Sequence, residues 1–158
     1  MGNEYVYYMD SPVGFLKIVT SEDCLFVCDF RSEKGDDENY GGYVPTVVQQ
    51  LQEYFDGKRK KFDLNLFFNG TGFQKEVWNQ LLDIPYGETV SYKYIAEKIN
   101  NPKAVRAVGG ANGNNSIVII APCHRVIGSD GTLTGFGGGL DNKKWLLDHE
   151  KKVLESAV

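Results

Sequence analysis

Residues 117–126 read Ile-Val-Ile-Ile-Ala-Pro-Cys-His-Arg-Val, an apolar run followed directly by a thiol and polar side chains. The run 117–121 predicts a buried strand, and the turn after it would present Cys123 at the rim. A thiol held there becomes a good nucleophile when a base or a cation favours its thiolate form. Neighbouring residues on a strand point to opposite faces, so we expect no direct hydrogen bond between Cys123 and His124.

An acidic residue further along the chain lies on an apolar helical stripe. Glu150 follows Leu146 by four residues and precedes Val153 by three. A carboxylate in such a place needs a partner. A chain from Glu150 through His124 and a water to Cys123 would direct a base toward the thiol, as in a catalytic triad. For the Cys-His pair taken alone, the alternative is a buried Cys beside a satisfied His.

The first half of the chain predicts an α/β unit. Aromatic and β-branched runs at 5–9, 15–19 and 24–28 are typical of strands, and residues 11–14 and 21–23 of turns. Residues 44–55 predict an amphipathic helix that stops before Gly57, and the alternation over 62–68 predicts another strand. Cys24 and Cys28 are expected to be packed thiols rather than metal ligands. The turn signals after Phe68 place a domain boundary between 1–70 and 71–158.

The second half predicts helices and a glycine-rich loop. Helices are expected over 73–82, from the cap Ser91 to Ile99, over 103–111 after Asn101-Pro102, and over 142–155, with the loop at 128–140. The middle two helices form a helix-turn-helix. Its second helix contains small residues and Arg106. That composition suits either close approach to a nucleic acid or tight helix packing with a solvated Arg106.

Charge and composition narrow the function classes. The net charge is −4, but residues 89–125 contain five basic residues and one acidic residue, so a nucleic-acid surface is expected there. No apolar run approaches the roughly 20 residues that span a membrane, and no membrane partner is expected. Three cysteines imply no disulfide framework, and we expect a reducing compartment, the cytoplasm, with association to the nucleoid if the source is bacterial.

Together these motifs resemble one family, the 6-O-alkylguanine-DNA alkyltransferases, or methylated-DNA–protein-cysteine methyltransferases. The resemblance rests on residues 122–126 (PCHRV), 70–74, 84–92 (IPYGETVSY), 106–109, Asn115, the glycine-rich loop and 145–150. It implies an α+β fold, with an N-terminal α/β ribonuclease-H-like domain and a C-terminal winged-helix-like, helix-turn-helix DNA-binding domain.

The resemblance also implies a DNA repair activity and roles for particular residues. Cys123 would take the alkyl group from 6-O-alkylguanine, and from 4-O-alkylthymine, once and irreversibly, after the nucleotide is flipped out of the duplex. Glu150, His124 and a water would generate the thiolate. Tyr92 would donate a proton to the leaving base, and Asn115 would hold the active-site turn and help to tie it to the helix of Tyr92.

Further residues are implied to contact DNA or the flipped base. The expected DNA contacts are Lys103, Arg106, Ala107, Gly109, Thr89 and Arg125, with Arg106 filling the gap that the flipped nucleotide leaves. The expected pocket consists of Tyr92, Val126, Phe136, Gly137 and Gly138. Some relatives have Tyr and Ser at the positions of Phe136 and Gly137, so backbone N–H groups would serve here. We expect a monomer bound to double-stranded DNA, without metal or cofactor.

Two other functions compete with this one. A lesion-binding protein of the alkyltransferase-like type would resemble residues 71–158, but it lacks the cysteine, so Cys123 argues against it. A cysteine hydrolase would need a histidine that reaches the thiol directly and an oxyanion hole, and it would turn over.

Overall fold

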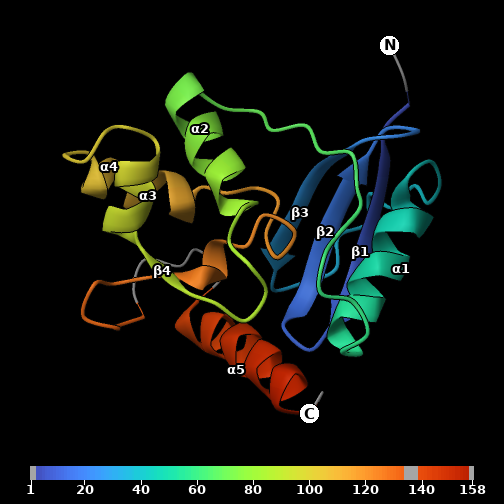
Figure 1. The fold of residues 1–158 in the computed structure, drawn as a ribbon. Helices are drawn as coiled ribbons and strands as arrows, with labels where there is room; N and C mark the ends of the chain where they lie inside the picture. The colour runs from blue at the N-terminus through green and yellow to red at the C-terminus, as the bar shows by residue number, and fades with distance from the viewer. Residues whose placement is uncertain (1–2, 134–138, 157–158) are drawn as a thin grey trace. The chain divides into compact units, whose positions relative to one another are not determined.

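The computed structural model describes residues 3–133 and 139–156. The chain divides into two compact units, Met1–Phe68 and Asn69–Val158 (Figure 1). Strands prevail in the first and helices in the second, which confirms the expected α+β class. Among the described residues no helix is both long and apolar enough to cross a bilayer.

The first unit is built on an antiparallel sheet with the strand order β1-β2-β3. β1 (Tyr5–Ser11) pairs with β2 (Gly14–Thr20) from Tyr5↔Thr20 to Ser11↔Gly14, and β2 pairs with β3 (Leu25–Arg31). The β1–β2 turn needs a glycine, because Gly14 has φ +88°. The three expected strands are therefore present, each somewhat longer or shifted.

Helix α1 (Val44–Phe55) has the bounds that the sequence predicted. Its apolar stripe places Val47, Leu51 and Tyr54 fully inside the unit. Leu16 and Ile18 of β2 are equally buried, so helix and sheet share one core. This core holds the ladder in a single register, since a slip by one residue would turn the apolar set outward.

The predicted strand 62–68 is wrong. The segment makes a single parallel bridge, Leu25↔Leu66. Elsewhere side chains take its backbone groups: Gln50 accepts the Asp63 N–H at 2.9 Å, and the Tyr43 hydroxyl accepts the Asn65 N–H at 3.1 Å. The apolar alternation is real, but these bonds compete with a strand ladder.

The second unit opens with α2 (Gly72–Leu81), which starts in a capping box. The Thr71 hydroxyl accepts the Gln74 N–H at 3.1 Å, and the Gln74 side chain accepts the Thr71 N–H at 3.0 Å. Trp78 of this helix donates its indole N–H to the Ala111 carbonyl at 2.8 Å, inside the unit. The helix is thereby fixed against the helix that contains Ala111.

The helix-turn-helix consists of α3 (Tyr92–Lys98) and α4 (Val105–Gly113), both packed on α2 (Figure 1). Ser91 caps α3 as predicted, accepting the Tyr94 N–H at 3.0 Å. The predicted start of the second helix at Lys103 is wrong. Residues 101–104 form a turn, closed by the Ala104 N–H on the Asn101 carbonyl at 3.0 Å. Asn followed by Pro suits the first two positions of such a turn as well as a helix start.

The apolar run 117–121 is a buried turn and not the predicted strand. Ile119 has φ +72°, in the left-handed region, and the Ala121 N–H bonds the Ile117 carbonyl at 3.1 Å. A left-handed conformation costs a β-branched residue about 1–2 kcal/mol. All five side chains are buried, and this packing holds the turn.

Two short elements follow this turn. η1 (Cys123–Arg125) is one turn of 3-10 helix, and β5 (Val126–Ile127) pairs in parallel with β4 (Val90–Ser91), immediately before α3. Helix α5 (Leu140–Ser156) closes the unit. The β4–β5 pair, which the sequence did not predict, joins the Cys123 segment to the start of α3.

The capping box at α2 should be measurable as stability. Thr71→Ala removes the acceptor of the Gln74 N–H, and we expect the free energy of unfolding to fall by about 1 kcal/mol in urea denaturation. Thr71→Ser keeps the hydroxyl and should lose much less. Equal losses for the two variants would mean that the cap does not contribute.

Candidate active site

The thiol and its histidine lie on the single 3-10 turn of η1. Cys123 is 2% exposed and His124 is fully buried. Successive side chains on a 3-10 turn diverge by about 120°. His124 Nδ1 has no hydrogen-bond partner among the described residues, so the direct bond between neighbours that the sequence argued against is not formed.

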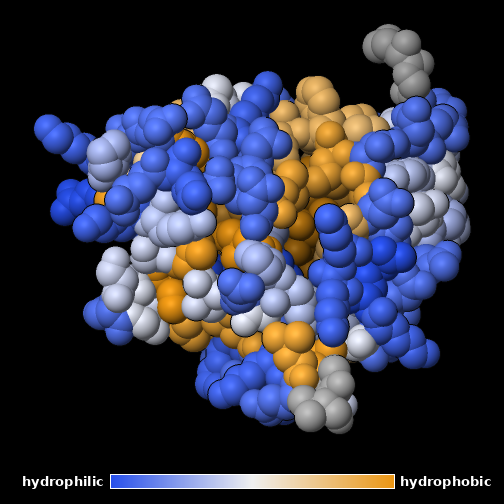
Figure 2. Space-filling model, viewed as in Figure 1, coloured by the Kyte–Doolittle hydropathy of each residue, from blue (hydrophilic) through white to orange (hydrophobic). Residues whose placement is uncertain are grey.

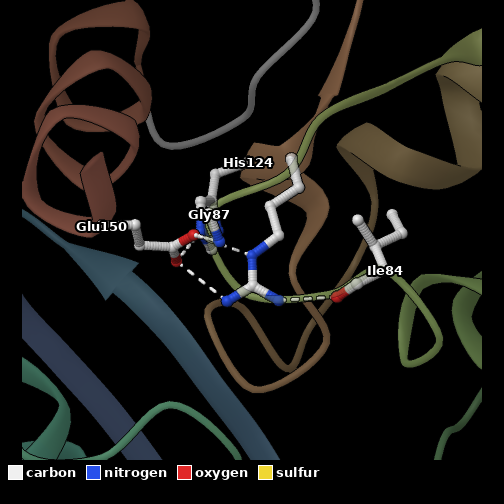
Figure 3. Close-up of polar contacts among 5 residues, drawn as sticks. Ile84, Gly87, His124 and Glu150 are labelled. Atoms are coloured by element: carbon white, nitrogen blue, oxygen red, sulfur yellow. Dashed lines mark hydrogen bonds and ion pairs between the residues drawn. The ribbon is translucent and has the colours of Figure 1, made fainter. Parts of the chain in front are cut away.

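Glu150 of α5 points at His124, as the sequence predicted. Its Oε2 lies 2.7 Å from His124 Nε2 (Figure 3). Gly87 donates its N–H to Oε1 at 3.0 Å. Gly87 has φ +78°, a left-handed conformation that favours glycine at this approach.

Arg125 completes the surroundings of Glu150, and its predicted contact with DNA is wrong. The side chain is buried and donates from Nε to Glu150 Oε1 and from Nη2 to Oε2, both at 2.9 Å. Its Nη1 donates to the Ile84 carbonyl at 2.8 Å. Because the guanidinium makes these three buried bonds, it is not available to a phosphate.

These contacts determine the protonation of the pair. Burial alone would raise the pKa of Glu150, but His124 and then Arg125 outweigh it and hold that pKa far below its usual range. Burial lowers the pKa of His124, which the Glu150 contact only partly opposes. His124 is therefore neutral at physiological pH, with its hydrogen on Nε2 facing the ionised carboxylate. The lone pair is on Nδ1, which makes Nδ1 the base.

Two asparagines hold the segment before and at Cys123. Asn115 donates to the Ala121 carbonyl at 2.9 Å and accepts the Ile117 N–H at 2.9 Å, so it spans the buried turn, as expected. Asn112, near the end of α4, donates to the Cys123 carbonyl at 3.2 Å. The helix-turn-helix is thus bonded directly to the residue that carries the thiol. The observed link from the helix of Tyr92 to this segment is the β4–β5 pair.

Tyr92, the first residue of α3, lies beside a buried lysine. Lys143 Nζ donates to the Val126 carbonyl at 2.5 Å and lies 3.5 Å from the Tyr92 hydroxyl. Burial lowers the pKa of Lys143 to about 8, while the charge of Cys123 acts to raise it. Opposite charges favour each other, so this cation also favours a thiolate at Cys123.

The sequence analysis did not single out Lys143, although a signal was present. Lys143 precedes Leu146 by three residues and Glu150 by seven, so it shares the buried stripe of α5. A charged residue on that stripe needs a partner for the same reason that Glu150 does.

The predicted DNA contacts on and around α4 lie at the surface. Lys103, Arg106, Ala107 and Thr89 are exposed, and Gly110 has open space beside it. The face drawn in Figure 2 is largely hydrophilic over α3 and α4. Gly109 approaches Tyr92, where a Cβ would be 3.9 Å from the ring. This helix therefore presents a small-residue surface with Arg106 outward.

The predicted base pocket is described only in part. Tyr92 is half-buried and Val126 is buried. Phe136, Gly137 and Gly138 lie outside the described residues, so their roles stay predictions. The carbonyls of Cys123 and Val126 accept bonds from Asn112 and Lys143, and each keeps a second lone pair. Within the described ranges no group of three His, Cys, Asp or Glu side chains could hold a metal ion.

Comparison with known proteins covers both units. Residues 5–68 match the family described as "6-O-methylguanine DNA methyltransferase, ribonuclease-like domain", and residues 72–152 match "6-O-methylguanine DNA methyltransferase, DNA binding domain". The methylated-DNA–protein-cysteine methyltransferase of Methanosarcina barkeri is 46% identical over 157 residues, covering 94% of this chain and 99% of its own length.

The chain belongs to the 6-O-methylguanine DNA methyltransferase family.

Solved structures of the 6-O-methylguanine DNA methyltransferase family agree with this fold. The crystal structure of Mycobacterium tuberculosis O6-methylguanine methyltransferase has a TM-score of 0.87 at 43% identity, covering 95% of this chain and 94% of that one. The Mycobacterium tuberculosis OGT in complex with DNA has a TM-score of 0.88 at 44% identity, covering 94% of each chain. The resemblance read from the sequence is confirmed, and DNA is the partner of the methyltransferase.

Lys143 should give this methyltransferase a pH-dependent stability. Its pKa of about 8 lies below the ordinary 10.5, so between these values the unfolded chain binds more protons at this group than the folded one. Stability from this group therefore rises with pH across that window. In urea denaturation, the free energy of unfolding of the native protein relative to Lys143→Met should increase from about pH 8 to about pH 10.

A matched control is Lys144→Met. Lys144 is exposed and pairs with Asp148 at 2.7 Å, so it should show no comparable trend. A difference between the native protein and Lys143→Met that stays constant over this window would contradict the assigned protonation.

Proposed function

We propose that this protein repairs 6-O-alkylguanine, and 4-O-alkylthymine, in double-stranded DNA by moving the alkyl group irreversibly to the sulfur of its own Cys123. One observation carries the proposal. In this member of the family, the PCHRV turn places Cys123 next to a neutral His124, and the buried Glu150 orients that ring so that the lone pair on Nδ1 is available. The site thus contains a nucleophile, a base and the group that orients the base.

The chemistry balances without a cofactor. The Cys123 proton passes through a water to His124 Nδ1, a sulfur–carbon bond forms, and the bond from that carbon to the guanine oxygen breaks. The base that leaves must gain a proton, and the Tyr92 hydroxyl is the proposed donor. The 3.5 Å contact with Lys143 supports this role, because a cation stabilises negative charge that develops on the phenol oxygen.

The product also explains why the protein would act once. A thioether has no good leaving group, and a hydrolase would need to release its product from the sulfur. The direct Cys–His hydrogen bond of a cysteine hydrolase is not formed here. An alkyltransferase-like lesion binder is disfavoured for another reason, since Cys123 is present with its base and orienting acid.

Access to the damaged atom requires flipping, because that atom is stacked inside the duplex. The exposed Arg106 on α4 is proposed to fill the gap, with Lys103 and Thr89 on phosphates and Ala107 and Gly109 against the groove. We propose entry into the minor groove, which the small residues of α4 suit. The bond from Asn112 to the Cys123 carbonyl supports a direct link between groove contact and thiol. A monomer per lesion suffices for this scheme.

Transfer stoichiometry tests the proposed function. Incubated with a duplex oligonucleotide bearing 6-O-methylguanine, each protein molecule should accept one methyl group on Cys123 and then stop, as mass spectrometry of the intact protein and its peptides would report. Cys123→Ala should bind without transfer, and Cys28→Ala is the matched control that keeps the acceptor. Repeated turnover, or transfer in Cys123→Ala, would refute the mechanism.

The role of Arg106 is tested by comparing two substrates. Arg106→Ala should slow transfer from duplex DNA by at least about tenfold more than transfer from free 6-O-benzylguanine, because only the duplex must be opened. Lys93→Ala, an exposed cation on α3, is a charge-matched control that should affect both substrates little. Equal losses on the two substrates in Arg106→Ala would remove the flipping role.

A further inference from the structure

Arg125 follows the Cys-His pair directly and is sealed inside the second unit. Its guanidinium makes a two-point ion pair with Glu150, with both N–O distances at 2.9 Å, and a third bond to the Ile84 carbonyl at 2.8 Å. The Tyr86 ring lies against it, with Cζ 5.4 Å from the ring centroid. A bidentate contact of this kind fixes both the position and the plane of the carboxylate.

Glu150 is saturated by these contacts. Its two oxygens accept from His124, twice from Arg125, and from the Gly87 N–H. Two like cations on one carboxylate would repel, so the permanent charge of Arg125 disfavours a second positive charge on His124. His124 thus faces a carboxylate whose orientation is fixed and whose negative charge is already balanced by Arg125.

We propose that Arg125 is a positioning residue of the transfer reaction, whose ion pair fixes Glu150 against His124 and offsets its charge, so that His124 Nδ1 stays unprotonated and can accept the Cys123 proton. The proposal rests on the proposed function for its kinetic consequence only. Without the offset, a buried Glu150 would favour a second proton on His124, and Nδ1 would already be protonated before it could accept the proton of the thiol.

Among the described residues, the charge of Lys143 also lowers the pKa of His124, but its own pKa of about 8 makes that charge depend on pH. Lys143 on α5 is bonded to the Val126 carbonyl and also faces Tyr92, while Cys123 precedes His124 on η1. Tyr86, whose pKa burial and then Glu150 raise to about 12, stays neutral. Arg125 is therefore the group bonded to Glu150 whose positive charge does not depend on pH.

The titration of His124 tests the proposal directly and without DNA. The chain has two histidines, so ¹⁵N-histidine labelling gives two pairs of ring-nitrogen signals, with His149 as an internal control assigned by His149→Gln. In the native protein His124 should remain the neutral Nε2–H form. In Arg125→Gln its midpoint should move upward by about 1–3 pH units, and in Arg125→Lys, which keeps the charge, by much less. An unmoved midpoint in folded Arg125→Gln would overturn the proposal.

Rates give a second readout that separates this role from a DNA contact. In Arg125→Gln the acid limb of the single-turnover rate should move to higher pH, equally for duplex DNA and free 6-O-benzylguanine. Loss confined to duplex DNA would show that Arg125 serves DNA binding instead. If the native protein transferred no alkyl group, only the proposed function would be refuted, because the titration of His124 does not require transfer.

A lone buried Glu150 could unfold Arg125→Gln, since breaking a buried pair is costly. The double variant Arg125→Gln/Glu150→Gln removes both charges and should fold. Its transfer should be slow at every pH because His124 is no longer oriented, while its acid limb stays near the native one. An acid limb that moves upward in the double variant as well would contradict charge offset as the cause.

Discussion

The second unit depends on how one buried carboxylate is satisfied. Glu150 of α5 cannot be placed in a protein interior without donors on both oxygens, and four contacts provide them from two other segments of the chain. The Gly87 turn, the η1 turn and α5 are therefore fixed relative to one another by the same group. Removing a single partner from such a cluster costs about 3–5 kcal/mol, because a buried charge is left unpaired. The contacts that orient His124 therefore also stabilise this unit.

The thiol is connected to the helix-turn-helix by short bonds rather than by packing alone. Asn112 joins the end of α4 to the Cys123 carbonyl, and the β4–β5 pair joins the start of α3 to the residues after η1. Asn115 closes the turn in between. A displacement of α4 must therefore be accommodated at the thiol. Rigid elements around a reactive group keep its orientation, which matters when the substrate base arrives from outside the stack.

Features that follow from local sequence patterns were predicted correctly. Features that depend on a partner far away in the sequence were not. The stripe of α1, the Ser91 cap and the position of Glu150 follow from periodicity and capping rules, and the PCHRV motif with its family resemblance identified the site. An apolar run such as 117–121 is compatible with a strand or a buried turn, and only the left-handed Ile119 separates them. Arg125 looked like a surface cation because its partner is in α5 and its third bond is to Ile84. Lys143 shares the buried stripe of α5 with Glu150, but its partners, the Val126 carbonyl and Tyr92, lie on other segments that the stripe does not reveal.

Burial of Cys123 has a consequence for the lifetime of the protein. A nucleophile that is spent in one event cannot be replaced, so every encounter with peroxide or a small disulfide would waste a whole molecule. Cys123 is 2% exposed, so its sulfur is shielded from such reagents in bulk solvent. In the proposed function, a flat base that enters beside Tyr92 would bring its alkyl group to the sulfur directly. Selectivity for the alkylated base then depends on access to the sulfur as much as on the reactivity of the sulfur. Burial keeps Cys123 unreacted until such a base enters the site.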